Sequence, residues 1–114
     1  MGQTTHDIII VGGGAAGLTA AAGCAQLGMR TALIEKQHMG GDCLYHGCVP
    51  SKTLLKTATV YSQAARFPDF GLPRLSRLPP PSAGNVMARV KRVIESIAPH
   101  DSPERFEKLG VEVF

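Results

Sequence analysis

The first 38 residues hold two short apolar runs with an alanine-rich segment between them. Residues 7–11 (DIIIV) are mostly β-branched and end at three glycines, which predicts a strand buried on both faces, as in a parallel sheet. Residues 15–27 predict a helix that is closed by Gly28. Residues 31–35 (TALIE) predict the next strand. This order indicates a βαβ unit with a right-handed crossover.

The middle of the chain is predicted to be a helix followed by a loop. Within residues 39–66, the run 51–65 has apolar residues at helical spacing and is predicted to be a helix. We expect these apolar residues to form the side of the helix that packs. These apolar residues are Leu54, Leu55, Ala58, Tyr61 and Ala65. Residues 67–83 contain five prolines and are therefore predicted to be a loop.

Residues 84–114 are predicted to add helices and the start of a strand. Residues 86–98 have apolar side chains on one side, which indicates an amphipathic helix. The apolar positions are Val86, Val90, Val93, Ile94 and Ile97. A short helix follows, with Asp101 or Ser102 as its cap and Pro103 in its first turn. Residues 111–114 (VEVF) alternate as a strand does. The pattern predicts an α/β fold with an incomplete parallel sheet.

Composition and charge narrow the classes of function. The chain has 114 residues, of which 44% are hydrophobic and 18% charged, as in one small globular domain. The net charge of +3 comes from scattered Lys and Arg, and only 5% of residues are aromatic, so we expect no nucleic-acid partner. The uncharged stretch 8–29 contains six glycines, and residues 1–7 hold no Lys or Arg. We therefore expect no membrane segment and a cytoplasmic protein.

The glycines after the first strand have the spacing of a dinucleotide-binding loop. In Gly12-x-Gly14-x-x-Gly17 the first permits a tight turn, the second lets backbone approach a pyrophosphate, and the third lets helix and strand pack closely. The following helix offers the amides of Ala15 and Ala16 and a positive dipole end to phosphates. The alternative is a loop that serves packing alone.

An acidic residue lies at the end of the second strand, where dinucleotide-binding βαβ units carry a carboxylate. Glu35 ends the second strand, 18 residues after Gly17, and suits the hydroxyls of an adenosine ribose. Its charge favours FAD or NAD over NADP, because a 2′-phosphate would be repelled. Lys36 beside it has two interpretations, a solvated cation at the strand end or a contact to the cofactor.

Two of the three cysteines lie close together. Cys43 and Cys48 are five positions apart, which on an ideal helix separates their Cα atoms by roughly 8–9 Å. A disulfide needs less than about 7 Å. If the pair bonds, this segment cannot be regular helix throughout, and Gly47 and the pair Gly40–Gly41 supply the backbone freedom. A helix that begins near the pair would stabilise a thiolate.

Other interpretations of the cysteines remain open. Zinc usually needs four ligands, and His46 is followed by no second ligand pair, so no metal site is predicted. The two thiols could also be unrelated core residues. Cys24, among the alanines of the first helix, is expected to be buried.

Residues 40–52 (GGDCLYHGCVPSK) resemble the redox signature of class I pyridine nucleotide-disulfide oxidoreductases. That family includes dihydrolipoamide dehydrogenase, glutathione reductase and mercuric reductase. The resemblance covers essentially the whole chain, which looks like the N-terminal part of an FAD-binding domain. Residues 97–111 look most like the mercuric-reductase-like or dihydrolipoamide-dehydrogenase-like branch.

The resemblance implies a role for each matching residue. Cys48 would be the flavin-proximal thiolate of a charge-transfer complex, and Cys43 the thiol that meets the substrate. Lys52 would lie near the flavin ring, although a lysine on the surface of a helix is the alternative. The implied FAD-binding set is Gly12, Gly14, Ala15, Ala16, Gly17, Glu35, Lys36, Gly41, Asp42, Cys43, Cys48 and Lys52.

The chain departs from the family pattern in two places. Asp42 stands where Thr is common, and its charge is expected to raise the pKa of Cys43. Tyr45 and His46 stand where many members have Asn and a small residue, which leaves the electron acceptor open among lipoamide, a glutathione-like disulfide, mercuric ion and a quinone.

The family's other domains do not fit within 114 residues. These are the NAD(P)H domain and the dimerisation domain, so this chain has no predicted site for NAD(P)H and is not expected to turn over alone. We expect a disulfide or metal-ion substrate, and either a homodimer or a missing C-terminal portion. The alternative is a truncated or split, non-catalytic FAD-binding or assembly module that needs a partner chain.

Overall fold

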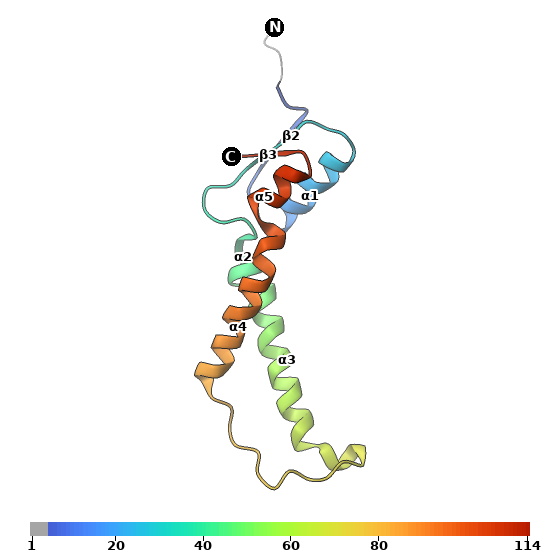
Figure 1. Cartoon of the computed structure of the whole chain (residues 1–114), viewed down its shortest axis with the longest axis vertical. Helices are drawn as coiled ribbons and strands as arrows, with labels where there is room; N and C mark the ends of the chain where they lie inside the picture. Colours follow the sequence, from blue (N-terminus) through green and yellow to red (C-terminus); the bar gives the residue numbers. More distant parts are fainter. Residues whose placement is uncertain (1–4) are drawn as a thin grey trace.

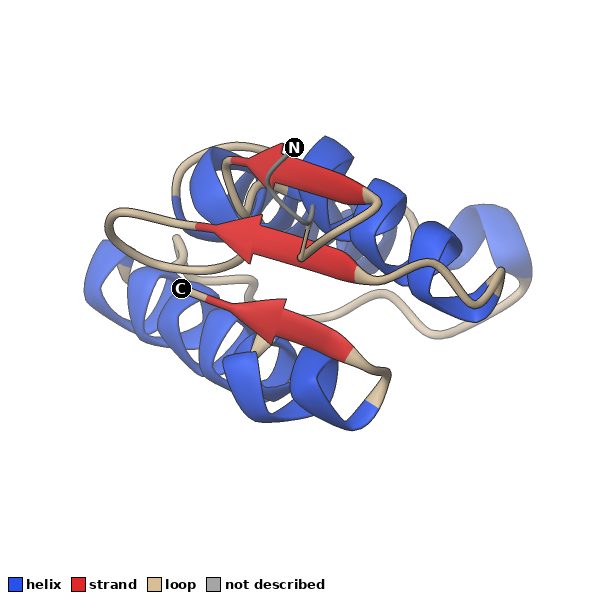
Figure 2. Cartoon of the chain, turned by 90° about the horizontal axis from the view of Figure 1, so that it is seen from above, coloured by secondary structure: helices blue, strands red, loops and turns tan. Residues whose placement is uncertain are grey.

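The computed structural model describes residues 5–114 as a three-stranded parallel sheet with helices. The strands lie in the order β1 (Ile8–Val11), β2 (Thr31–Ile34) and β3 (Val111–Val113), with β2 in the centre (Figure 2). Thr31 is in register with both Ile8 and Val111. The predicted α/β fold with a parallel sheet is confirmed.

The first helix connects the two strands that the sequence predicts. α1 (Ala15–Gln26) ends one residue before Leu27, its C-cap. Gly28 follows with φ +79°, a left-handed conformation that glycine adopts without strain. Cys24 is half-buried on this helix, so the expectation that it is buried was wrong.

The hydrophobic core lies on one side of the sheet. It is formed where α1 and α5 (Pro103–Lys108) pack against the strands. Its buried members are Leu18, Ala21, Leu33, Met39, Phe106 and Val111. Phe106 and Leu33 are 2% and 0% exposed, so they fill the space between the helices and the sheet.

The other side of β1 is open, which corrects the prediction of a strand buried on both faces. Val11 is 81% and Ile9 59% exposed, while Ile8 and Ile10 are half-buried. The run 8–11 predicts a strand buried on both faces because its side chains are apolar on both faces. Within residues 5–114, however, the helices that pack on the strands contribute to a single core.

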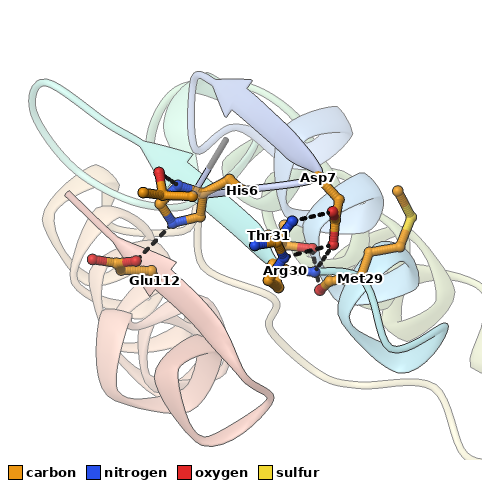
Figure 3. Close-up of polar contacts among 7 residues, drawn as sticks. His6, Asp7, Met29, Arg30, Thr31 and Glu112 are labelled. Carbon is orange, nitrogen blue, oxygen red and sulfur yellow. Dashed lines mark hydrogen bonds and ion pairs between the residues drawn. The ribbon is translucent and has the colours of Figure 1, made fainter. Parts of the chain in front are cut away.

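Polar contacts join the strands near their amino ends (Figure 3). Arg30 donates from its backbone amide to Asp7 Oδ2 at 2.8 Å and from Nη2 to Oδ1 at 2.7 Å. His6 Nε2 lies 2.7 Å from Glu112 Oε2, so the residue before β1 is linked to β3. The ion pair and this hydrogen bond hold the chain entering β1 against the sheet.

A helical hairpin extends away from the sheet (Figure 1). α3 (Cys48–Ala65) and α4 (Ala83–Ile97) pack side by side. The chain measures 76 × 27 × 18 Å, and its radius of gyration of 20.6 Å exceeds the roughly 13 Å of a compact domain of this length. None of the helices described in residues 5–114 is long and apolar enough to cross a membrane.

The connection between the hairpin helices is mostly irregular, as the prolines predict. It contains the short 3₁₀ helix η1 (Phe67–Phe70). α4 begins before the predicted residue 86, because Ser82 caps it by accepting a hydrogen bond from the Asn85 amide at 3.4 Å. The 3₁₀ helix η2 (Ala98–Asp101) then leads to α5, whose cap is Ser102.

The predicted packing side is confirmed for α4 and wrong for α3. Val90 of α4 is 3% exposed. On α3 the expected apolar side is turned to solvent, with Leu55 68% exposed, and Thr53 is buried instead. Thr53 tolerates burial because its hydroxyl donates to the Val49 carbonyl at 2.8 Å, which leaves no unpaired polar atom.

Candidate functional site

The glycine loop follows β1 and opens α1. Gly12 has φ +105°, a conformation that side chains disfavour. A Cβ built on Gly17 would lie 1.8 Å from the Gly12 carbonyl oxygen, so the helix can approach the loop only with glycine at this position. A Cβ on Gly14 would meet nothing within 4 Å. The loop is therefore tight where it packs on the helix and open beside Gly14.

The start of α1 is available to an anion. Gly14 is its N-cap, and no side chain within the described residues caps this 12-residue helix. The first turn holds no acidic residue, and Ala15 and Ala16 are exposed. Helix amides that point outward with the positive end of the dipole suit a phosphate group. Together with the open space beside Gly14, these residues fit the pyrophosphate of a dinucleotide.

Glu35 lies beside the same loop. Its Oε2 accepts a hydrogen bond from the Gly13 amide at 2.6 Å, and its Oε1 accepts one from the Gln37 amide at 2.8 Å. The first of these bonds, helped by the second, lowers the pKa of Glu35 below its ordinary value. A carboxylate has acceptor capacity beyond two hydrogen bonds, so Glu35 remains able to receive ribose hydroxyls. Lys36 next to it is exposed.

The segment that carries the cysteines is anchored on the glycine loop. The Gly40 amide donates to the Gly13 carbonyl at 2.8 Å. Gly41, with φ +53°, begins α2 (Gly41–Tyr45), and a Cβ there would lie 2.9 Å from the Gly14 Cα. Two glycine backbones thus meet without side chains between them. Sequence analysis explained Gly40 and Gly41 by chain freedom and placed Gly41 in the implied FAD-binding set, but it missed this contact.

The helix is interrupted between Cys43 and Cys48, as a disulfide between these two residues would require. α2 ends at Tyr45 and α3 begins at Cys48, with Gly47 as its N-cap. The turn is closed by the Gly47 amide, which donates to the Asp42 carbonyl at 2.6 Å. The expectation that this segment departs from regular helix is confirmed. Figure 1 shows α2 between the sheet and the hairpin.

The two thiols interact. Both are free, with Cys43 half-buried and Cys48 exposed. The pKa of Cys43 is raised, first by a side-chain hydrogen bond with Cys48 and second by burial, while the positive charge of Lys52 opposes the shift. The expected influence of Asp42 on this pKa was wrong, because the groups that raise it are Cys48 and burial. Lys52 therefore lies within electrostatic reach of the cysteine pair.

A cavity of about 320 Å³ lies beside Glu35 and α2. It is lined by Glu35, Gln37, His38, Gly41, Asp42, Tyr45 and His46. The ring centroids of His38 and Tyr45 lie 5.9 Å apart, and those of Tyr45 and His46 lie 6.4 Å apart. Sequence reasoning did not assign His38 or Tyr45 to a site, because no spacing rule connects them. Within residues 5–114 no three metal-ligating side chains gather.

Three comparisons place this arrangement among known proteins. The model of the pyridine nucleotide-disulphide oxidoreductase family matches residues 6–113. Dihydrolipoyl dehydrogenase of Bacillus subtilis is 49% identical over 69 residues, which are 60% of this chain and 15% of that protein. The dihydrolipoyl dehydrogenase of Zymomonas mobilis is 39% identical over 92 residues, 81% of this chain and 19% of that protein. The matched region is thus less than a fifth of these relatives' length.

Solved structures agree in fold. The crystal structure of LpdA from Mycobacterium tuberculosis superimposes with a TM-score of 0.75 at 27% identity, over 93% of this chain and 22% of that one. The HOCl-induced flavoprotein disulfide reductase RclA of Escherichia coli, solved as a Cu(II) complex, gives 0.71 at 23% identity over 98% of this chain and shows the fold alone. From the family match over residues 6–113, the chain belongs to the pyridine nucleotide-disulphide oxidoreductase family.

Proposed function

We propose that this chain is the FAD-binding, dithiol-bearing part of a flavoprotein disulfide oxidoreductase. The observation that carries the proposal is the backbone contact between the glycine loop and the cysteine segment, Gly40 to Gly13. It holds a phosphate-type cradle and a pair of interacting thiols in one rigid unit. The match to dihydrolipoyl dehydrogenases supports a dithiol or disulfide of the lipoyl type as the substrate.

Different residues of the chain would bind different parts of FAD. The amides of Ala15 and Ala16 and the open backbone at Gly14 would hold the pyrophosphate, and Glu35 would hold the adenosine ribose. Lys52 lies within electrostatic reach of Cys43 and would place a positive charge near the flavin ring. When bound, FAD supplies two-electron redox chemistry. In the intact family NAD(P)H is the electron donor.

The dithiol exchanges with the substrate in two balanced steps. Once Cys43 has lost its proton to solvent, its sulfur attacks one substrate sulfur, which breaks the substrate disulfide and leaves the other substrate sulfur to take up a proton as a thiol. The Cys48 thiolate then attacks the Cys43 sulfur, which releases the second thiol and leaves a Cys43–Cys48 disulfide. Two electrons and two protons have passed from the dithiol to the substrate. Such thiol couples operate in the reducing cytoplasm, where we place this protein.

A visible spectrum of the purified chain mixed with FAD tests the proposal. We expect a protein-bound flavin band and, after two-electron reduction with dithionite, a long-wavelength absorbance from the contact between flavin and the Cys48 thiolate. The variant Cys48→Ser should keep the flavin band and lose that absorbance, whereas Cys24→Ser should keep both. No bound flavin, or a long-wavelength band that survives in Cys48→Ser, would count against the function.

A second candidate function follows from the open side of β1. The exposed Ile9 and Val11, on a strand at the end of the sheet, favour a non-catalytic FAD-binding or assembly module that needs a partner chain or a second copy. Gel filtration with light scattering separates the two. A dimer or larger species that becomes a monomer in Val11→Lys supports the module, and a stable wild-type monomer contradicts it.

A further inference from the structure

A second cavity lies between the two hairpin helices. Its volume is about 340 Å³, and it is lined by Val49, Lys52, Thr53, Lys56, Arg89, Val93 and Ile97. Three of these side chains are cationic and none is acidic. Neither the glycine loop nor the cavity beside Glu35 contributes to its lining. We call it the cationic groove.

The positive charges converge from both helices. Lys52 and Lys56 are four positions apart on α3, so they occupy the same side of the helix and repel each other. Arg89 reaches across from α4, and its Nη1 donates to the Thr53 carbonyl at 3.3 Å. That hydrogen bond uses one of the five guanidinium N–H groups. A bound anion would relieve the repulsion between the lysines and accept hydrogen bonds from the N–H groups that remain.

The floor of the groove is apolar. Val49, Val93 and Ile97 are half-buried there, and the Thr53 hydroxyl is already satisfied by the Val49 carbonyl. An inorganic anion would leave this floor unused. A volume near 300 Å³ is the lower end of what small-molecule sites provide, so the groove suits a compact ligand.

We propose that the cationic groove binds a small organic anion, a carboxylate on a short hydrocarbon chain. The carboxylate lies among Lys52, Lys56 and Arg89, and the chain lies on Val49, Val93 and Ile97. The inference goes beyond the proposed function, since no flavin or substrate disulfide takes part. Lys52 is the residue that belongs to both sites.

Titration of the FAD-free chain with octanoate, followed by the backbone amide NMR signals of α3 and α4, tests this proposal. Two probes separate the parts of the ligand: octanamide lacks the charge and acetate lacks the chain. We expect octanoate to bind at least tenfold more tightly than either. Because FAD is left out, a failure here does not bear on the flavin site, nor does a failure of the flavin site bear on this result.

Matched charge variants locate the anion. Lys56→Met and Arg89→Met should each weaken octanoate binding about tenfold or more. Lys91→Met removes the same charge from an exposed residue of α4 that pairs with Glu95 at 3.8 Å, and should change binding less than twofold. If Arg89→Met unfolds the hairpin, octanoate binding by Lys56→Met still decides the test, because Lys56 is exposed. Equal losses in Lys56→Met and Lys91→Met, or equal binding of acetate and octanoate, would overturn the proposal.

Discussion

The amide of Gly40 donates a hydrogen bond to the carbonyl of Gly13 at 2.8 Å, and this contact joins the two functional segments of the chain. Gly13 belongs to the loop that fits a pyrophosphate, and Gly40 precedes the helix that carries Cys43. Because both partners are backbone atoms, the separation between cradle and thiols does not depend on side-chain rotamers. Transfer of electrons between a bound cofactor and the thiols requires such a constant separation.

The packing of α1 on the loop makes Gly17 intolerant of any side chain. In Gly17→Ala the new methyl would lie 1.8 Å from the Gly12 carbonyl, so the helix must move, and we expect a loss of about 1–3 kcal/mol or more in the free energy of unfolding. Chemical denaturation measures it. Gly23→Ala on the same helix meets nothing within 4 Å and should gain about 0.5–1 kcal/mol. Equal effects at both positions would contradict this packing.

Gly41 is predicted to couple the cysteine segment to cofactor binding. Gly41→Ala introduces a Cβ 2.9 Å from Gly14 and a left-handed alanine, whereas Gly71→Ala has the same backbone strain with open space. Both should lose about 1–2 kcal/mol of stability from the strain. We expect only Gly41→Ala to weaken FAD binding, by tenfold or more in a fluorescence titration. Loss of affinity in Gly71→Ala would show that strain, and not the contact, is responsible.

The hydrogen bond between the thiols is predicted to keep Cys43 protonated. Cys48→Ala removes the main cause of its raised pKa, while Lys52 continues to favour the thiolate. The pKa of Cys43 should therefore fall, and its alkylation by iodoacetamide near pH 8 should become faster. Peptide mapping in a Cys24→Ala background reports Cys43 alone. Cys48→Ser preserves a hydrogen-bonding group, so its alkylation rate should lie between the rates of the Cys24→Ala background and of Cys48→Ala. A faster rate in Cys48→Ser than in Cys48→Ala would contradict the assignment.

The ion pair at the start of the strands is predicted to govern acid stability. Hydrogen bonds from Arg30 lower the pKa of Asp7 from 3.8 to about 2. A carboxylate whose pKa is lower in the folded state stabilises the fold fully above the unfolded pKa, and this contribution disappears as the pH falls from about 4 to 2. Asp7→Asn should flatten this part of a stability-versus-pH curve. Arg30→Met should flatten the same part of the curve. The double variant should flatten it little more than either single variant, because both changes remove one interaction.

Much of the chain was predictable because its signals are local. The βαβ unit, the left-handed Gly28 after α1, the cap at Ser102 and the apolar side of α4 follow from residues within a few positions of one another. The interruption between Cys43 and Cys48 was also predictable, because the distance across five helical positions is set by helix geometry.

The tertiary structure decided what depends on residues far apart in sequence. Glu35 receives the Gly13 amide across 22 positions, and no periodicity encodes that pairing. Leu55 has the spacing of a buried residue but faces solvent, because α4 packs on the side of α3 that holds Thr53. Val11 is exposed because a strand buries two faces only when elements pack on both. Local patterns specify the elements, and the faces they bury are settled only when the whole chain is assembled.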